Sequence, residues 1–269
     1  MGRSTNIEWT EHTWNPFVGC TPASAGCKNC YAMRMANRLS AAGMPQYAGT
    51  VRNGVWTGVL NRATDSAMRK PYTISGNAMV FVNSMSDFFH AAAWPEWQAE
   101  ALAIISATPH HTYQILTKRP ERISSVLDTL GVRRMPDNVW LGATVEDHRV
   151  VGRIDPLREA PARIRFLSVE PMTAPLGEVD LSGIHWVITG GESGPHARPL
   201  NAEWVREVRD QCTAAGVSFF HKQWGKAVNN PLAANCPPGE SVADFIKRVD
   251  PTGKGGALLD GRLHREFPE

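Results

Sequence analysis

Short apolar runs alternate along the chain with amphipathic stretches, and this alternation limits the folds open to the chain more than any other feature. The pattern is typical of strands followed by crossover helices in a parallel sheet. We expect strands at 79–83, 113–117, 139–143, 164–169, 186–189 and 217–221, with a weaker one near 7–13. The predicted fold class is therefore α/β, with a partial or complete parallel (β/α) barrel.

Helix signals fall between these runs. Pro95 and Pro120 stand where helices would begin, because proline is favoured in a first turn, and Asn201 can cap a helix that ends near Gly216. Trp204, Val208 and Cys212 recur at helical spacing, and this predicts their burial on one face. A short helix is also expected at 242–249.

The chain length of 269 residues is within the range of one barrel domain. We expect that domain to span residues 1–226, with residues 227–269 as a tail packed on the barrel. Residues 40–77 have few apolar repeats and several glycines, and we interpret them as an insertion or lid. Because no stretch approaches the ~20 apolar residues of a membrane span, we expect a cytoplasmic protein without membrane contact.

Polar residues gather directly after the predicted strands. The carboxyl ends of parallel strands meet at one mouth of a barrel, so these residues are expected to form a shared site. The candidates at these positions are Asn83, Ser84, Asp87, Lys118, Thr144, Glu146, Ser168, Glu170, Glu192, Arg198 and Lys222.

Cys20, Cys27 and Cys30 lie within eleven residues of one another, after the weak first strand. This crowding fits metal binding in a reducing compartment better than a disulfide framework. Three thiolates satisfy three corners of a four-iron cluster and leave the fourth iron open, whereas a structural metal site normally takes a fourth protein ligand. A structural zinc site is the alternative. Cys212 and Cys236 do not have the spacing of a zinc ribbon, and we expect Cys212 in the core and Cys236 as a bystander.

A cysteine loop after the first strand of a (β/α) barrel resembles the radical S-adenosylmethionine superfamily, although the C-x6-C-x2-C spacing departs by three residues from the usual C-x3-C-x2-C. Further motifs are similar to those of phage and bacterial proteins named after phage gene products 37 and 68, which are often found beside three-Cys-motif partner proteins. These motifs are Trp14-Asn15-Pro16, Asp87-Phe88-Phe89, Leu116-Thr117-Lys118-Arg119-Pro120, Ser168-Val169-Glu170-Pro171, Gly190-Gly191-Glu192-Ser193-Gly194, Lys222-Gln223-Trp224-Gly225 and Leu259-Asp260-Gly261-Arg262.

The superfamily resemblance implies a [4Fe-4S] cluster on Cys20, Cys27 and Cys30, with S-adenosyl-L-methionine on the open iron. It implies one electron from a donor such as flavodoxin or ferredoxin, and a 5′-deoxyadenosyl radical that abstracts hydrogen from an organic substrate. Tyr31 occupies the place where the superfamily often has an aromatic residue near the cofactor adenine. The superfamily's Gly-Gly-Glu motif follows the second strand, whereas Gly190-Gly191-Glu192 follows the sixth here, so we do not carry that role over.

The candidate residues divide into two groups by chemistry. Oxygen-bearing side chains can accept hydrogen bonds from the ammonium and ribose groups of the cofactor. Together with the tyrosine, we assign to cofactor binding Tyr31, Asn83, Ser84, Asp87, Thr144, Glu146, Ser168 and Glu170. We assign to catalysis Glu192, Lys118, Lys222 and Arg198. Helix capping is the alternative role for the first group, and solvated surface charge for the cations of the second.

We therefore expect a radical S-adenosylmethionine enzyme that modifies or isomerises an anionic small molecule, a nucleotide or a nucleic-acid base. The net charge of +2 is too balanced for a dedicated polynucleotide binder. A three-Cys-motif protein is a further expected partner. Two other classes stay open: a non-catalytic zinc or iron–sulfur module that binds nucleic acid or protein, and a barrel hydrolase or transferase with Glu170 and Glu192 as acid and base.

Overall fold

The computed structural model describes residues 5–269, so the first four residues of the predicted barrel domain lie outside the described part. The described chain divides into two compact units. The first unit runs to Ala143 and also contains Asp155–Arg163, and the second contains Thr144–Ile154 and Ile164–Glu269. The predicted boundary between a barrel at 1–226 and a tail at 227–269 stays a prediction.

The first unit is built on four strands in the order β1 (His12–Trp14), β6 (Met79–Val82), β7 (Thr112–Thr117) and β8 (Val139–Thr144). Each neighbouring pair is parallel. Helix α3 (Pro95–Ala107) connects β6 to β7, and a 3-10 turn at Pro120–Arg122 leads into α4 (Ile123–Thr129), which connects β7 to β8. Both prolines stand at helix starts, as predicted.

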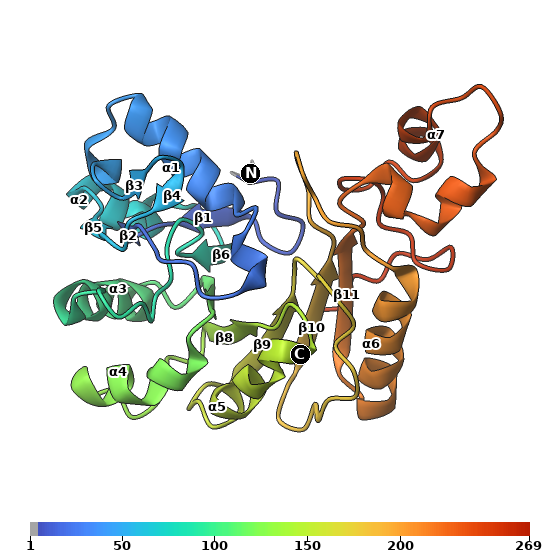
Figure 1. Ribbon diagram of the computed structural model, residues 1–269. Helices are drawn as coiled ribbons and strands as arrows, with labels where there is room; N and C mark the ends of the chain where they lie inside the picture. The colour runs from blue at the N-terminus through green and yellow to red at the C-terminus, as the bar shows by residue number, and fades with distance from the viewer. Residues whose placement is uncertain (1–4) are drawn as a thin grey trace. The chain divides into compact units, whose positions relative to one another are not determined.

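Between β1 and β6 the first unit contains a group of short elements. They are β2 (Phe17–Val18), α1 (Tyr31–Ala41), β3 (Val51–Arg52), β4 (Val55–Trp56), β5 (Asn61–Arg62) and α2 (Asp65–Met68). Strand β2 pairs antiparallel with β5, and β3 with β4, while α1 lies next to β3 and β4 (Figure 1). Tyr47, Trp56 and Met68 are buried, so residues 40–77 are packed despite their poor apolar pattern. Their role as an insertion or lid stays a prediction.

The second unit is built on three parallel strands in the order β9 (Ile164–Val169), β10 (Trp186–Gly190) and β11 (Ser218–Gln223). Helix α6 (Ala202–Ala215) packs along β11 (Figure 1). The Asn201 side chain caps α6 by accepting from the backbone N–H of Glu203, and Gly216 ends the helix at φ 67°. The short helices α5 (Ile154–Arg158) and α7 (Val242–Val249) complete the α-helices of the described chain.

The strand order steps through the chain without reversal, which is the topology of a (β/α) barrel rather than of a doubly wound sheet. The predicted fold class, α/β with a parallel barrel, is confirmed in its partial form, with seven strands among the described residues. All residues of β9 and β10 except Arg165 are buried, as expected for strands covered on both faces.

Three predictions about these elements need correction. The first strand begins at His12 rather than near residue 7, and β11 continues through Lys222 and Gln223, which were expected to follow it. The buried residues of α6 are Val205, Val208 and Cys212, while Trp204 is only partly buried. The buried position of Cys212 was predicted correctly. No helix of the described residues is both long and apolar enough to cross a bilayer.

Candidate metal and cofactor site

The three clustered cysteines lie on the loop between β2 and α1, and all three are free thiols that are partly exposed. Cys30 is the N-cap residue of α1. The Cys27 sulfur accepts a hydrogen bond from the Ala23 backbone N–H at 3.4 Å. Cys20 and Cys30 also pack against a hydrophobic cluster that includes Val18.

Backbone contacts tie this loop to the turn that follows β6. The N–H of Gly19 donates to the Met85 carbonyl at 3.1 Å, and the Ser86 hydroxyl donates to the Gly19 carbonyl at 2.7 Å. Gly19 has φ 106°, and a Cβ there would lie 2.1 Å from the Val59 carbonyl oxygen. Only glycine can hold this backbone position beside Cys20, because any other side chain would clash.

The Asp87 carboxylate is buried and receives four hydrogen bonds. Its Oδ1 accepts from the backbone N–H of Phe89 at 3.0 Å and from the Thr117 hydroxyl at 2.7 Å. Its Oδ2 accepts from the backbone N–H of Lys118 at 3.1 Å and from Arg119 Nη1 at 2.8 Å. The sequence analysis assigned Asp87 to cofactor binding. In this structure, four groups of the protein itself donate hydrogen bonds to its carboxylate.

Arg119 connects Asp87 to the cysteine loop. Its Nη2 atom donates to the Thr21 carbonyl at 3.0 Å and to the Thr21 hydroxyl at 2.7 Å. Burial raises the pKa of the Cys20 thiol to about 12, and the charge of Asp87 adds to this rise while Arg119 opposes it. The neighbouring Lys118 donates to Asp87 through its backbone N–H, and the catalytic role assigned to its side chain stays a prediction.

His90 contacts the same threonine and was missed by the sequence analysis. Burial and the charge of Arg119 lower the pKa of His90 to about 4, so the ring is neutral near pH 7. Its Nδ1 accepts from the Ala92 backbone N–H at 3.1 Å, so the ring proton is on Nε2, which lies 2.9 Å from the Thr21 hydroxyl. Thr21 directly follows Cys20 and His90 directly follows the Asp87-Phe88-Phe89 motif, but their contact could not be predicted because they are 69 positions apart.

Three predicted cofactor residues lie beside the same loop. The Tyr31 hydroxyl donates to the Ser84 carbonyl at 3.0 Å, and the Ser84 hydroxyl bonds to the Asn15 amide at 3.2 Å. Asn83 is buried at φ 59° and donates from Nδ2 to the Phe17 carbonyl at 3.0 Å. Its Oδ1 is buried and has no hydrogen-bond partner among the described residues. A buried acceptor of this kind can take a hydrogen bond from an ordered water or a ligand.

We tested whether the three thiols fit an iron–sulfur cluster. Among the described residues, no group of three or more His, Cys, Asp or Glu side chains is arranged to hold a single metal ion. The thiolates of a four-iron cluster bind different iron atoms, so they need not converge on one point as zinc ligands do. Three partly exposed thiols on one loop, without disulfides, therefore have the donor chemistry that the cluster requires.

In the second unit, Glu170 forms an ion pair with Lys222, with Lys222 Nζ 2.8 Å from Glu170 Oε1. Both side chains are only 15% exposed. Gly190 lies against this carboxylate, and a Cβ at position 190 would be 3.0 Å from Glu170 Cδ. The structure thus joins a predicted cofactor residue, Glu170, to a predicted catalytic residue, Lys222.

Glu192 and Arg198 form a second pair in this unit. The buried Glu192 carboxylate accepts from the Arg198 side chain through both oxygens, at 3.0 Å and 2.6 Å. The glycines before Glu192 serve packing, because a Cβ on Gly191 would lie 2.2 Å from the Trp224 carbonyl oxygen. Gly191 thus allows a close approach of its backbone to the backbone at Trp224.

The remaining predicted cofactor residues, Thr144, Glu146 and Ser168, are all buried. Arg153 Nη1 lies 2.9 Å from Glu146 Oε2 and 2.8 Å from the Thr144 carbonyl. The sequence analysis did not select Arg153, which carries no motif. The Ser168 carbonyl accepts from the Val145 backbone N–H at 3.0 Å, so its backbone role is structural. Convergence of all the predicted residues on one site stays a prediction.

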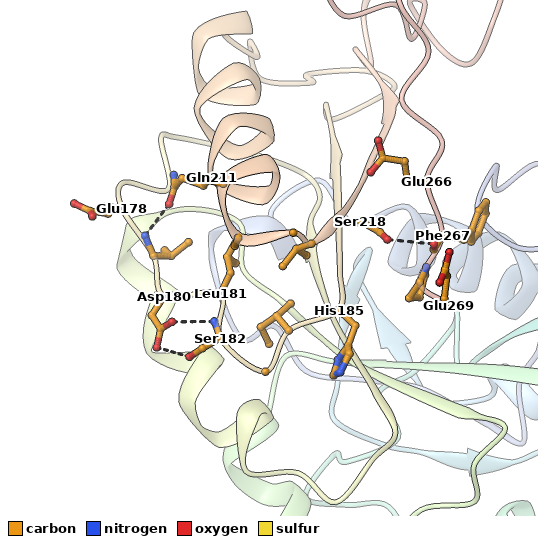
Figure 2. Close-up of a pocket in the computed structure, with 18 residues that line it drawn as sticks. Glu178, Asp180, Leu181, Ser182, His185, Gln211, Ser218, Glu266, Phe267 and Glu269 are labelled. Carbon is orange, nitrogen blue, oxygen red and sulfur yellow. Dashed lines mark hydrogen bonds between the residues drawn. The ribbon is translucent and has the colours of Figure 1, made fainter.

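A cavity of about 1080 Å³ lies at the amino ends of β10 and β11 (Figure 2). None of the predicted site residues line it. Figure 2 shows Asp180 bonded to Ser182, and Ser218 bonded to Phe267, so these polar groups hold the surrounding loops. In (β/α) barrels this end of the strands serves stability, whereas chemistry occurs at the carboxyl ends.

The fold and the site define an α/β protein with a partial parallel barrel and a three-thiol loop. The chain belongs to the family described as "Protein of unknown function (DUF5131)", whose model matches residues 4–268. A search among curated proteins gave no match.

Solved structures of spore photoproduct lyase are similar to the chain. A cysteine-to-serine mutant is 12% identical, with a TM-score of 0.48 over 79% of this chain and 76% of that one. A complex with dinucleoside spore photoproduct is 13% identical, with a TM-score of 0.42 over 73% and 59%. A double mutant with bound AdoMet and dinucleoside spore photoproduct is 13% identical, with a TM-score of 0.42 over 67% and 56%.

Proposed function

We propose that this protein is a radical S-adenosylmethionine enzyme. Cys20, Cys27 and Cys30 would hold a [4Fe-4S] cluster, with S-adenosyl-L-methionine on the iron that lacks a cysteine. The observation that carries the proposal is a loop with three free, partly exposed thiols. Two hydrogen bonds of Gly19, to Met85 and Ser86, join this loop to the turn after β6. When bound, the cluster and cofactor supply a 5′-deoxyadenosyl radical that abstracts hydrogen from an organic substrate.

The turn after β6 is proposed to bind the methionine end of the cofactor. Asn83 Oδ1 is a buried acceptor that lacks a partner among the described residues, and an ammonium group supplies the missing donor. Tyr31 is about half exposed at the start of α1, directly after Cys30, and its ring is proposed to pack near the cofactor adenine. Asp87 is excluded from direct binding in this proposal, because four protein donors already surround its carboxylate.

The proposed substrate class is an anionic organic molecule, with a nucleotide or a nucleic-acid base as the leading candidate. Lys222 and Arg198 would bind the anion, but each already pairs with a carboxylate, Glu170 and Glu192 respectively. A phosphate group would therefore compete with these carboxylates for the cations. Thr144, Glu146 and Ser168 are proposed to contact the ribose of the cofactor. Lys118 is proposed to take part in catalysis.

Anaerobic reconstitution with iron and sulfide tests the proposal. We expect about four irons and four sulfides per chain, and an absorption band that dithionite bleaches. Cys20→Ala, Cys27→Ala and Cys30→Ala should each lose most of the iron. Cys212→Ala and Cys236→Ala are matched controls that should keep it, since neither lies on the loop. Stoichiometric zinc, or iron content that is independent of the loop cysteines, would contradict the proposal.

A further inference from the structure

Residues 12–64 contain no Asp or Glu, although the chain has 26 such residues among 269. The same stretch contains Lys28, Arg34, Arg38, Arg52 and Arg62. Only Arg62 has an acidic partner among the described residues, because it pairs with Asp65 and Glu100 outside this stretch. The cysteine loop therefore lies within a segment in which four of the five Lys and Arg side chains have no acidic partner among the described residues.

The Lys and Arg side chains without an acidic partner lie on α1 or in segments next to it. Arg34, Met35 and Arg38 are exposed on this helix, while Ala32 and Ala36 are buried on its other side. Residues 34 and 38 are four apart, so their side chains lie on the same face. Lys28 precedes the helix and is exposed, and Arg52 is exposed on β3, which packs beside α1 (Figure 1). We call Lys28, Arg34, Met35, Arg38 and Arg52 the α1 face.

The α1 face begins at the cysteine loop, because Cys30 is the N-cap of the helix. With a rise of 1.5 Å per residue, Arg34 and Arg38 lie about 6 Å and about 12 Å along the axis from Cys30. A protein bound to this face would therefore lie next to the thiols. Residues 12–64 carry no second cysteine group that could hold another cluster.

We propose that the α1 face is the docking surface for an acidic one-electron carrier protein. The inference rests on the proposed function, since it assigns this carrier the reduction of the cluster. One electron would pass from the hydroquinone anion of a flavin carrier to the oxidised cluster, leaving the neutral flavin semiquinone. No bond is made or broken, and no proton is transferred.

An acidic protein fits this surface better than a nucleic acid does. Apolar side chains are exposed among the cations, with Met35 at 40%, Met44 at 40% and Val55 at 50%. Phosphates gain nothing from such groups, whereas transient protein interfaces combine apolar contacts with a charged rim. The balanced net charge of +2 also disfavours polynucleotide binding by the whole chain.

Binding of an acidic flavodoxin to the full chain tests the inference. The double variant Arg34→Glu/Arg38→Glu should raise the Kd at least about tenfold at low ionic strength, because like charges would then face each other. The control Arg133→Glu/Lys247→Glu changes the net charge equally at exposed sites that are not part of the α1 face, and it should change the Kd by less than about threefold. The conservative double variant Arg34→Lys/Arg38→Lys should retain binding, which separates loss of charge from loss of folding.

Equal effects of the two charge-reversed variants, or no effect of either, would overturn the inference. It would also be overturned if the α1 variant lost affinity for a DNA oligonucleotide and kept its affinity for flavodoxin. The binding assay needs no cluster, so failure to assemble iron and sulfide would defeat the proposed function alone. In the reconstituted protein, the α1 variant should slow cluster reduction by flavodoxin hydroquinone and leave reduction by photoexcited 5-deazariboflavin, a small neutral donor, unchanged.

Discussion

The Arg119–Asp87 pair gives the sharpest prediction for the stability of the site. Both side chains are largely buried, with 12% and 6% exposed, and Nη1 lies 2.8 Å from Oδ2. Arg119→Met removes the charged partner of Asp87 and both hydrogen bonds to Thr21. Breaking one side of a buried pair costs about 3–5 kcal/mol, and we expect about 3 kcal/mol here because three other donors still surround the carboxylate.

A double-mutant cycle separates the pair from its surroundings. Asp87→Asn alone leaves the Arg119 charge buried and should cost about 3 kcal/mol, at the lower end of the same range. The double variant Asp87→Asn/Arg119→Met contains neither buried charge, so it should recover about 2 kcal/mol relative to the sum of the single changes. Urea titrations followed by tryptophan fluorescence give the three unfolding free energies. Additivity within about 0.5 kcal/mol would refute the claim that these charges stabilise each other.

Two further predictions concern buried groups of the second unit. Burial lowers the pKa of His221 from 6.5 to about 3, so below pH 6.5 the unfolded chain binds the extra proton, and stability should fall by about 2 kcal/mol between pH 7 and pH 5. His221→Gln should remove this part of the pH dependence in urea titrations, and an unchanged profile would contradict it. Gly191→Ala should cost more than about 3 kcal/mol through the clash at the Trp224 carbonyl, and near-normal stability would refute the packing role assigned to this glycine.

The strands of the parallel sheet and several of the helices could be predicted because the sequence signals that define them are local. Strand β9 and helix α7 have the predicted bounds, since runs of buried apolar residues and a capping serine, Ser241, are visible in the sequence itself. The helix between Asn201 and Gly216 was likewise found from its cap and its terminal glycine. The strands within residues 40–77 could not be predicted, because each is two residues long and too short to show an alternating apolar pattern.

The partners of the site residues could not be predicted from the sequence. Asp87 and Arg119 are 32 positions apart, and their contact depends on the adjacency of β6 and β7. The pairing of Glu146 with Arg153 was missed for a related reason, since Arg153 carries no motif and lies in an irregular 3-10 segment. Residue type identified which side chains could bind a ligand or take part in catalysis. The fold decides which of them already form hydrogen bonds or ion pairs within the protein.

Anaerobic incubation of the reconstituted protein with S-adenosyl-L-methionine and dithionite tests the central claim most directly. The proposed function predicts 5′-deoxyadenosine and methionine in equal amounts, with no product from a variant that lacks Cys20, Cys27 and Cys30. An intact, reduced cluster that releases no 5′-deoxyadenosine would contradict it.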